Sequence, residues 1–132
     1  MSDTVALILY AATLAFTGWA MHLVQRLSAR GTLRRNNFVG IRTRATQASD
    51  AAWAAGHRAA EPRMLQAART GYAAGVLTAA ATAAQVLGVV PLPVALAVPT
   101  LGLVLLLVFA LHGAVVANRA ARAADGGRAP RP

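Results

Sequence analysis

The side chains that could bind a ligand or catalyse a reaction are concentrated in one polar stretch, residues 37–57. Its candidate binding side chains are Arg42, Thr43, Ser49, Asp50, Trp53 and His57. An arginine guanidinium can bind a phosphate or carboxylate through two parallel hydrogen bonds. The N-terminus of a helix offers free backbone N–H groups to the same kind of anion. The stretch therefore favours binding of an anionic group, such as a phosphate or a lipid headgroup.

Catalytic and metal-binding interpretations of the same residues are weaker. Ser49 and His57 would lie two turns apart on one helix, too far for the hydrogen bond that activates a serine nucleophile. We therefore predict that the chain is not an enzyme. The three histidines, His22, His57 and His112, have no metal-ligand spacing, and the chain has no cysteine. The sequence predicts neither a metal nor a cofactor.

The polar stretch is expected to begin as a loop and to continue as a helix. Asn36, Asn37 and Gly40 are residue types that favour turns. Thr46 is the predicted N-cap, because its hydroxyl can accept a hydrogen bond from the first helical turn. From Gln47 the alanine-rich sequence has a high helix propensity.

The predicted helix would bring the candidate side chains together. Ser49, Trp53 and His57 recur every four residues, and Asp50 lies three residues before Trp53, so the four share one face. Arg42 can fold back toward Asp50 and the start of the helix. Pro62 is expected to kink this loop helix or to start a new one.

Composition and charge favour a membrane protein. A chain of 132 residues is long enough for one domain. It is 57% hydrophobic and only 13% charged, against about 25% charged residues in a typical soluble domain. The net charge is nevertheless +9, and all thirteen basic residues are arginines that fall in two segments. Charge confined in this way is typical of loops between membrane spans.

Three segments are long and apolar enough to be predicted as transmembrane helices, residues 4–25, 70–90 and 94–117, since about 20 apolar residues cross a bilayer. A signal peptide is the competing interpretation of the first, but a basic segment before it is missing. The predicted fold is an all-α integral membrane protein with three transmembrane helices and a cytoplasmic amphipathic loop helix between the first and the second. The membrane domain would cover residues 1–120, with a cytoplasmic loop at 26–69.

The sequence also predicts details of packing and of the C-terminus. Gly71 and Gly75 form a Gly-x-x-x-Gly pattern that lets helix backbones approach closely and permits a homodimer. Residues 121–132 are predicted to be a disordered basic tail, because arginine, glycine and proline alternate there without periodicity.

The distribution of arginines predicts the topology. Nine lie in the loop 26–69 and four between Arg119 and the C-terminus, and none lies near the N-terminus or the turn at Pro91. Positive residues stay in the cytoplasm, which places the N-terminus outside and the loop and C-terminus inside. This arrangement would bring His22 and His112 to the level of the polar stretch.

Simpler interpretations of these residues stay open. In one alternative, Arg42 has only a structural role, in which it pairs with Asp50 or caps a helix. In another, Trp53 anchors the chain at the depth of the lipid headgroups. His22 and His112 can be interhelical hydrogen-bonding residues. The other arginines can neutralise anionic lipid headgroups, each contributing about 1 kcal/mol.

The polar stretch resembles the signature of a family. Gly40-x-Arg42-Thr43, followed by Thr46, Ser49, Trp53 and His57, is similar to the motif of the SdpI family of bacterial integral membrane proteins. The layout of spans around the motif extends the resemblance over residues 20–117. Gly40 and Thr46 are expected to be structural, as are Gly71 and Gly75.

The resemblance implies a multi-span protein of the bacterial inner membrane. The family's named member confers immunity to a secreted, membrane-active peptide toxin and, with toxin bound, holds a transcriptional repressor at the membrane. It carries further spans ahead of this module, so this chain is expected to be a module-only member. The expected partners are membrane lipids, a peptide toxin and a cytoplasmic repressor, with no direct binding of nucleic acid. The rival hypothesis is a membrane protein that binds a lipid or an anionic small ligand, as a transporter subunit or a lipid-modifying enzyme.

Overall fold

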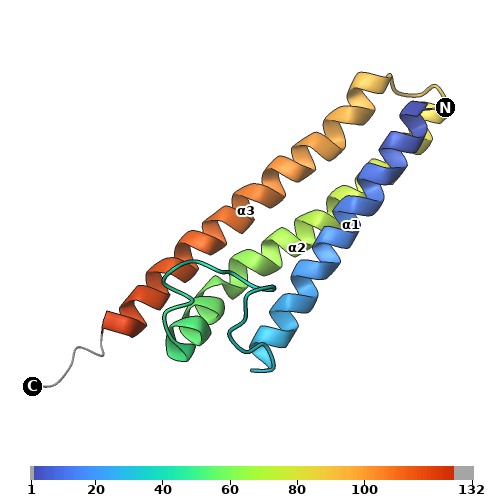
Figure 1. Ribbon diagram of the computed structural model, residues 1–132. Helices are drawn as coiled ribbons and strands as arrows, with labels where there is room; N and C mark the ends of the chain where they lie inside the picture. Colours follow the sequence, from blue (N-terminus) through green and yellow to red (C-terminus); the bar gives the residue numbers. More distant parts are fainter. Residues whose placement is uncertain (1, 127–132) are drawn as a thin grey trace, which may run out of the picture. The chain divides into compact units, whose positions relative to one another are not determined.

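The computed structural model describes residues 2–126, and within them the chain forms three α-helices and no strand (Figure 1). Helix α1 covers Ser2–Ala29, α2 covers Asp50–Val86 and α3 covers Leu92–Gly126. The predicted all-α class is therefore confirmed. The helices contribute to two compact units. The first contains the residues up to Met21 together with Gln66–Val108, and the second contains His22–Leu65 together with the residues from Phe109 onward.

Two helices end at glycines in the left-handed conformation. After α1, Gly31 has a φ of 68°; its N–H donates to the Ser28 carbonyl, and the next N–H donates to the Leu27 carbonyl. After α2, Gly88 has a φ of 72° and makes the equivalent bond to the Gln85 carbonyl. This pairing satisfies carbonyls that the helix itself leaves free, so both helices stop where the sequence places a glycine.

Helix α2 differs from the prediction in two respects. It starts at Asp50 rather than at Gln47, and it runs through Pro62 without interruption. The expected loop helix and the expected second span are thus one continuous helix. Pro62 removes one backbone hydrogen bond, the one to the Arg58 carbonyl, but both residues lie on an exposed side of the helix. The loss of this hydrogen bond therefore costs little free energy at this position.

Helix α3 is also longer than the predicted third span. Pro93 lies in its first turn, where a missing N–H costs nothing, and Pro99 is accommodated inside it. The helix continues to Gly126, so the first six residues of the expected irregular tail are helical. The rest of that tail, residues 127–132, lies outside the described residues.

In the first unit, α1 and α2 approach so closely that their backbones touch. A Cβ atom built on Gly71 would lie 2.8 Å from the Gly18 Cα and 2.9 Å from the Leu14 carbonyl oxygen. One built on Gly75 would lie 3.0 Å from the Ala11 carbonyl oxygen. The predicted Gly-x-x-x-Gly contact is thus made with α1 of the same chain. A homodimer would have to use another surface.

In the second unit, the first turns of α2 pack against α3 and the loop. Trp53, Met64 and Ala117 belong to its apolar core. Gly56 lets α2 approach both the loop and α3, because a Cβ there would lie 2.8 Å from the Thr46 methyl and 3.0 Å from the Ala117 carbonyl oxygen. This packing fixes the part of α2 that carries the candidate binding residues.

Helices α1 and α3 are long and apolar enough to cross a membrane. In each, only 17% of the most apolar window is buried inside the protein, whereas the core helix of a soluble protein would be mostly buried. The apolar side chains instead point outward, for example Leu9 and Phe16 on α1 and Leu101 on α3. Helix α2 does not meet the same criterion of apolarity within the described residues, so the span predicted at residues 70–90 stays a prediction.

Candidate functional site

The loop before α2 is held in shape by a pair of threonines. The Thr46 side chain is fully buried; its Oγ1 donates to the Ile41 carbonyl at 2.7 Å and accepts the Thr43 N–H at 2.9 Å. In return, Thr43 Oγ1 accepts the Thr46 N–H at 3.1 Å. The prediction of Thr46 as the N-cap of the helix is therefore wrong. Its hydroxyl is used inside the loop, three residues before the helix cap.

The N-cap is Ser49, and the start of α2 is tied to the loop by an ion pair. Ser49 Oγ accepts the Ala52 N–H at 3.1 Å. Asp50, in the first turn, binds Arg35 Nε at 3.0 Å, and the same guanidinium donates to the Gln47 carbonyl at 2.8 Å. Arg42, the partner that the sequence offered for Asp50, instead donates to the Asn37 carbonyl.

His57 joins the loop to α2 through both of its ring nitrogens. Nδ1 lies 2.9 Å from the Trp53 carbonyl oxygen, and Nε2 lies 3.0 Å from the backbone nitrogen of Ile41. A carbonyl can only accept, so Nδ1 carries the proton, and Nε2 must accept the Ile41 N–H. The imidazole is therefore neutral, and it is 97% buried. This burial lowers the pKa of His57 below its usual value of 6.5.

Gly40 and Trp53 complete the packing around this imidazole. Gly40 has a φ of 105°, and a Cβ on it would lie 2.6 Å from His57 Nε2 and 3.0 Å from the Trp53 ring. The Trp53 ring lies 4.1 Å from that of His57, centre to centre, and its indole N–H donates to the Leu33 carbonyl at 3.0 Å. Because Trp53 is buried, the alternative in which it anchors the chain among lipid headgroups is not supported.

The tip of the loop presents apolar side chains outward. Asn36 Oδ1 accepts the backbone N–H groups of Phe38 and Val39, each at 2.8 Å, which forms a tight turn. Phe38 is 87% exposed as a result. The loop therefore carries an outward-facing aromatic ring as well as the exposed arginines Arg34, Arg42 and Arg44.

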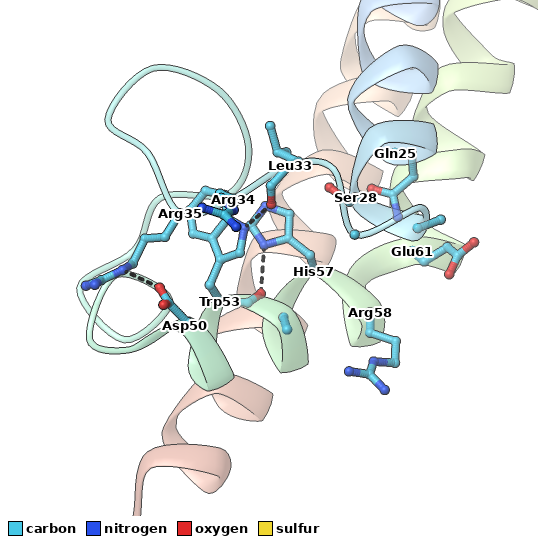
Figure 2. A pocket seen from close by; sticks show the side chains of 13 residues that line it. Gln25, Ser28, Leu33, Arg34, Arg35, Asp50, Trp53, His57, Arg58 and Glu61 are labelled. Atoms are coloured by element: carbon cyan, nitrogen blue, oxygen red, sulfur yellow. Dashed lines mark hydrogen bonds and ion pairs between the residues drawn. The ribbon is translucent and has the colours of Figure 1, made fainter.

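A cavity of about 820 Å³ lies beside this packed cluster, entirely within the second unit. Its walls come from the end of α1, the beginning of the loop and the first turns of α2 (Figure 2). The lining residues are Gln25, Ser28, Ala29, Gly31, Leu33, Arg34, Arg35, Asp50, Trp53, Ala54, His57, Arg58 and Glu61. Arginines, carboxylates and two neutral polar side chains thus surround one space.

The structure brings only some of the predicted site residues to this cavity. Asp50, Trp53 and His57 line it, whereas Arg42, Thr43 and Ser49 hold the loop and the start of α2. His22 is half-buried on α1, His112 is exposed on α3, and neither lines the cavity.

The cavity also has lining residues that the sequence did not single out as site residues. Among them are Gln25, Ser28 and Glu61. A polar turn at the end of an apolar helix was the only local signal for the first two. Within residues 2–126, no group of three histidine, aspartate or glutamate side chains is placed to hold a metal ion.

The family model described as the SdpI/YfhL protein family matches residues 32–117. The chain belongs to this family. The matched segment contains the loop from Thr32 onward, α2 and most of α3, so it includes the Gly40–His57 packing. Searches of curated proteins and of solved structures gave no match. Membership of the SdpI/YfhL family and the two apolar helices together indicate a membrane protein.

Gly40 should tolerate alanine less well than Gly31, although both have positive φ. Gly31 has nothing within 4 Å of a built Cβ, so Gly31→Ala should cost only the left-handed backbone, about 1–2 kcal/mol. Gly40→Ala should cost about 1–3 kcal/mol more, because its Cβ meets a ring held at both nitrogens. Thermal unfolding of the purified variants would measure this, and equal losses would contradict the packing role of Gly40.

Stability should fall as the pH drops below about 6.5. The unfolded chain binds a proton to His57 near that pH, while the folded chain resists it because the native pKa is lowered. The stabilisation from neutral His57 is thus complete above pH 6.5 and is lost as the pH falls toward the native pKa. Unfolding temperatures of the wild type and of His57→Gln between pH 8 and pH 5 would test this. The same pH slope in both proteins would refute it.

Proposed function

We propose that this chain protects a bacterial cell against a secreted, membrane-active peptide toxin. The observation that carries the proposal is the family match over residues 32–117, which includes the loop from Thr32 onward and its packing on α2. The outward-facing apolar surfaces of α1 and α3 support it, since a toxin that acts in the bilayer can be met there. In this proposal the chain is a multi-pass protein of the inner membrane.

The proposed topology has the N-terminus outside and the loop and C-terminus in the cytoplasm. The arginines support it, because all thirteen lie in residues 26–69 or in the C-terminal region from Arg119 onward. A third crossing by residues 70–86 of α2 is supported by the close contact of Gly71 and Gly75 with α1. Small residues at such a contact are typical of helix pairs in membranes.

In this topology the toxin and the loop act on opposite sides. A toxin arriving from outside would meet the helix surfaces within the bilayer and the turn around Pro91. The loop would signal to a cytoplasmic partner such as a repressor, through its exposed arginines and Phe38. The rigid attachment of the loop to His57 would carry a change in helix packing to that surface.

A second candidate function is the binding of a lipid or an anionic small ligand. The specific observation that favours it is the cavity beside His57, which is lined by three arginines. Arginine is suited to phosphate and carboxylate groups because its planar fork can bind two oxygens at once. The exposed arginines outside the cavity would bind lipid headgroups at the membrane surface.

Single cysteines should report the topology, because the chain has none of its own. Phe38→Cys and Pro91→Cys both place the thiol at exposed positions. With a membrane-impermeant maleimide, Pro91→Cys should be labelled in intact cells and Phe38→Cys only after the membrane is opened. Labelling of Phe38→Cys in intact cells would overturn the proposed orientation.

Cells that express the chain should keep their membrane potential in the presence of a toxin that depolarises cells lacking it. Arg42→Ala should weaken the protection about tenfold, because a hydrogen bond from a charged group contributes about 1.5–3 kcal/mol. Arg44→Ala is the matched control, since Arg44 is exposed and makes no side-chain hydrogen bond or ion pair within the described residues. Depolarisation would be measured with a potential-sensitive dye across a panel of secreted bacterial peptides.

The panel also separates the two functions. Protection that is unchanged in Arg42→Ala would keep immunity and remove the loop from its mechanism. If the chain protects against none of the peptides, while the wild-type protein is present in the membrane at equal level, the second candidate becomes the better account.

A further inference from the structure

The tip of the loop, residues 36–39, is held in one conformation by hydrogen bonds. The side chain of Asn36 accepts the two backbone N–H groups that follow Asn37. The Asn36 carbonyl accepts a hydrogen bond from Gln47 Nε2 at 2.8 Å, which ties the tip to the segment just before α2. The Arg42 guanidinium donates to the Asn37 carbonyl, so one positive charge is fixed at the tip itself.

This conformation turns two apolar side chains outward. Phe38 is 87% exposed and Val39 is 40% exposed, whereas Ile41 is partly covered where the loop meets His57. Because the backbone of the tip is already ordered, burying the ring against a partner would cost little further conformational entropy. The tip therefore presents a preformed apolar contact.

The loop around the tip is strongly basic. Residues 30–49 contain five arginines and no aspartate or glutamate. All five are exposed, namely Arg30, Arg34, Arg35, Arg42 and Arg44. Of these, Arg35 alone makes an ion pair within residues 2–126, with Asp50. The charge of this segment therefore favours an anionic partner.

The loop also begins where the first apolar helix ends. The part of α1 that is long and apolar enough to cross a membrane covers Asp3–Ala29, and Phe38 follows nine residues later. Nine residues extend over at most about 30 Å. The hydrogen bond from Trp53 to the Leu33 carbonyl shortens this reach further, because it folds the chain back onto α2. The tip is therefore tethered near the bilayer surface at which α1 ends.

We propose that the tip inserts the Phe38 ring into the headgroup region of an anionic bilayer, while the surrounding arginines bind the lipid phosphates. Apolar side chains with arginines beside them are the usual composition of segments that lie in the membrane interface. Each arginine near such a surface is attracted to anionic lipid. The inference rests on the membrane location in the proposed function and not on protection against a toxin.

The small size of the tip favours a lipid surface over a protein or a nucleic acid. A stable protein interface buries about 800 Å² on each side around a well-packed apolar core, and the tip offers only Phe38 and Val39. A single-stranded nucleic acid is usually bound by several aromatic rings in series, and residues 30–49 contain one. A bilayer is fluid, so a single ring can enter it without a matching shape.

A fluorescent label on Val39→Cys would report on insertion, because the chain has no other cysteine. The protein would be placed in nanodiscs of phosphatidylcholine, with or without phosphatidylglycerol, in which a nitroxide near the top of the acyl chains quenches a label that it contacts. Ala48→Cys is the matched label site, since Ala48 is exposed in the same loop but outside the tip. We expect about threefold stronger quenching at Val39→Cys, strongest in the anionic nanodiscs and weakened there by salt.

Phe38→Ser removes the ring and should reduce the quenching at Val39→Cys about threefold, because the apolar contact with the bilayer is lost. Asn37→Ser is the matched control and should leave the quenching unchanged, since Asn37 is exposed at the same tip and contributes no apolar side chain. Both variants should unfold at the temperature of the parent protein, because Phe38 is exposed and the Asn37 side chain makes no hydrogen bond within residues 2–126. The same loss of the ring leaves the thiol of Phe38→Cys in water, open to maleimide.

Equal quenching at Val39→Cys and Ala48→Cys would overturn the proposal, and so would quenching that survives Phe38→Ser. A third outcome would assign the tip to a protein partner instead of lipid. In that case the Val39→Cys label stays in water in every nanodisc and is shielded only after a cytoplasmic extract is added.

Phe38→Ser in the depolarisation assay separates this inference from toxin protection. The quenching experiment contains no toxin, so its result stands whether or not the chain protects cells. If Phe38→Ser loses the quenching and keeps full protection, insertion of the tip is supported and is independent of immunity.

Discussion

The second unit depends on one hydrogen bond, donated by the Ile41 backbone to the neutral imidazole of His57. Three features make this bond possible. The Trp53 carbonyl selects the tautomer that leaves Nε2 free to accept. Gly40 has no side chain to block the approach, and Thr46 holds the Ile41 carbonyl so that its N–H faces the helix. Loop and helix are thereby joined through a group that carries no charge.

The cavity follows from that attachment. Trp53 stacks on His57 and binds the Leu33 carbonyl, which draws the start of the loop over the first turns of α2. The Arg35–Asp50 ion pair holds the same segment further toward the helix start, although both side chains are partly exposed and the pair contributes little by itself. The space that remains lies between these contacts and the end of α1. Of its three arginines, only Arg35 makes an ion pair within residues 2–126.

Local pattern was enough to predict much of the fold. A run of about 20 apolar residues is enough to predict a membrane-spanning helix. The apolar runs therefore predicted α1 and α3 without any knowledge of tertiary contacts. The four-residue spacing of Trp53 and His57 predicted their shared face. Each of these depends only on residues one or two turns apart.

The features that were missed depend on contacts between distant residues. Thr46 and Ser49 are equally good caps by type, and only the Ile41 carbonyl decides that Thr46 serves the loop. Several arginines are close enough in the sequence to form an ion pair with Asp50, and the conformation of the loop determines that Arg35 is the partner. Pro62 usually breaks or kinks a helix, but α2 is continuous through it, with Pro62 and Arg58 both on an exposed side. The cavity joins α1 to α2 through residues about 30 positions apart, which no periodicity could reveal.

The contact between Gly18 and Gly71 limits how this protein can change over time. Each glycine faces backbone atoms of the other helix. Unlike a side chain, the backbone of a helix cannot make room by rotating about a single bond. A larger residue on either helix is therefore not rescued by a single smaller one opposite. Any substitution that widens this contact must therefore move a whole helix.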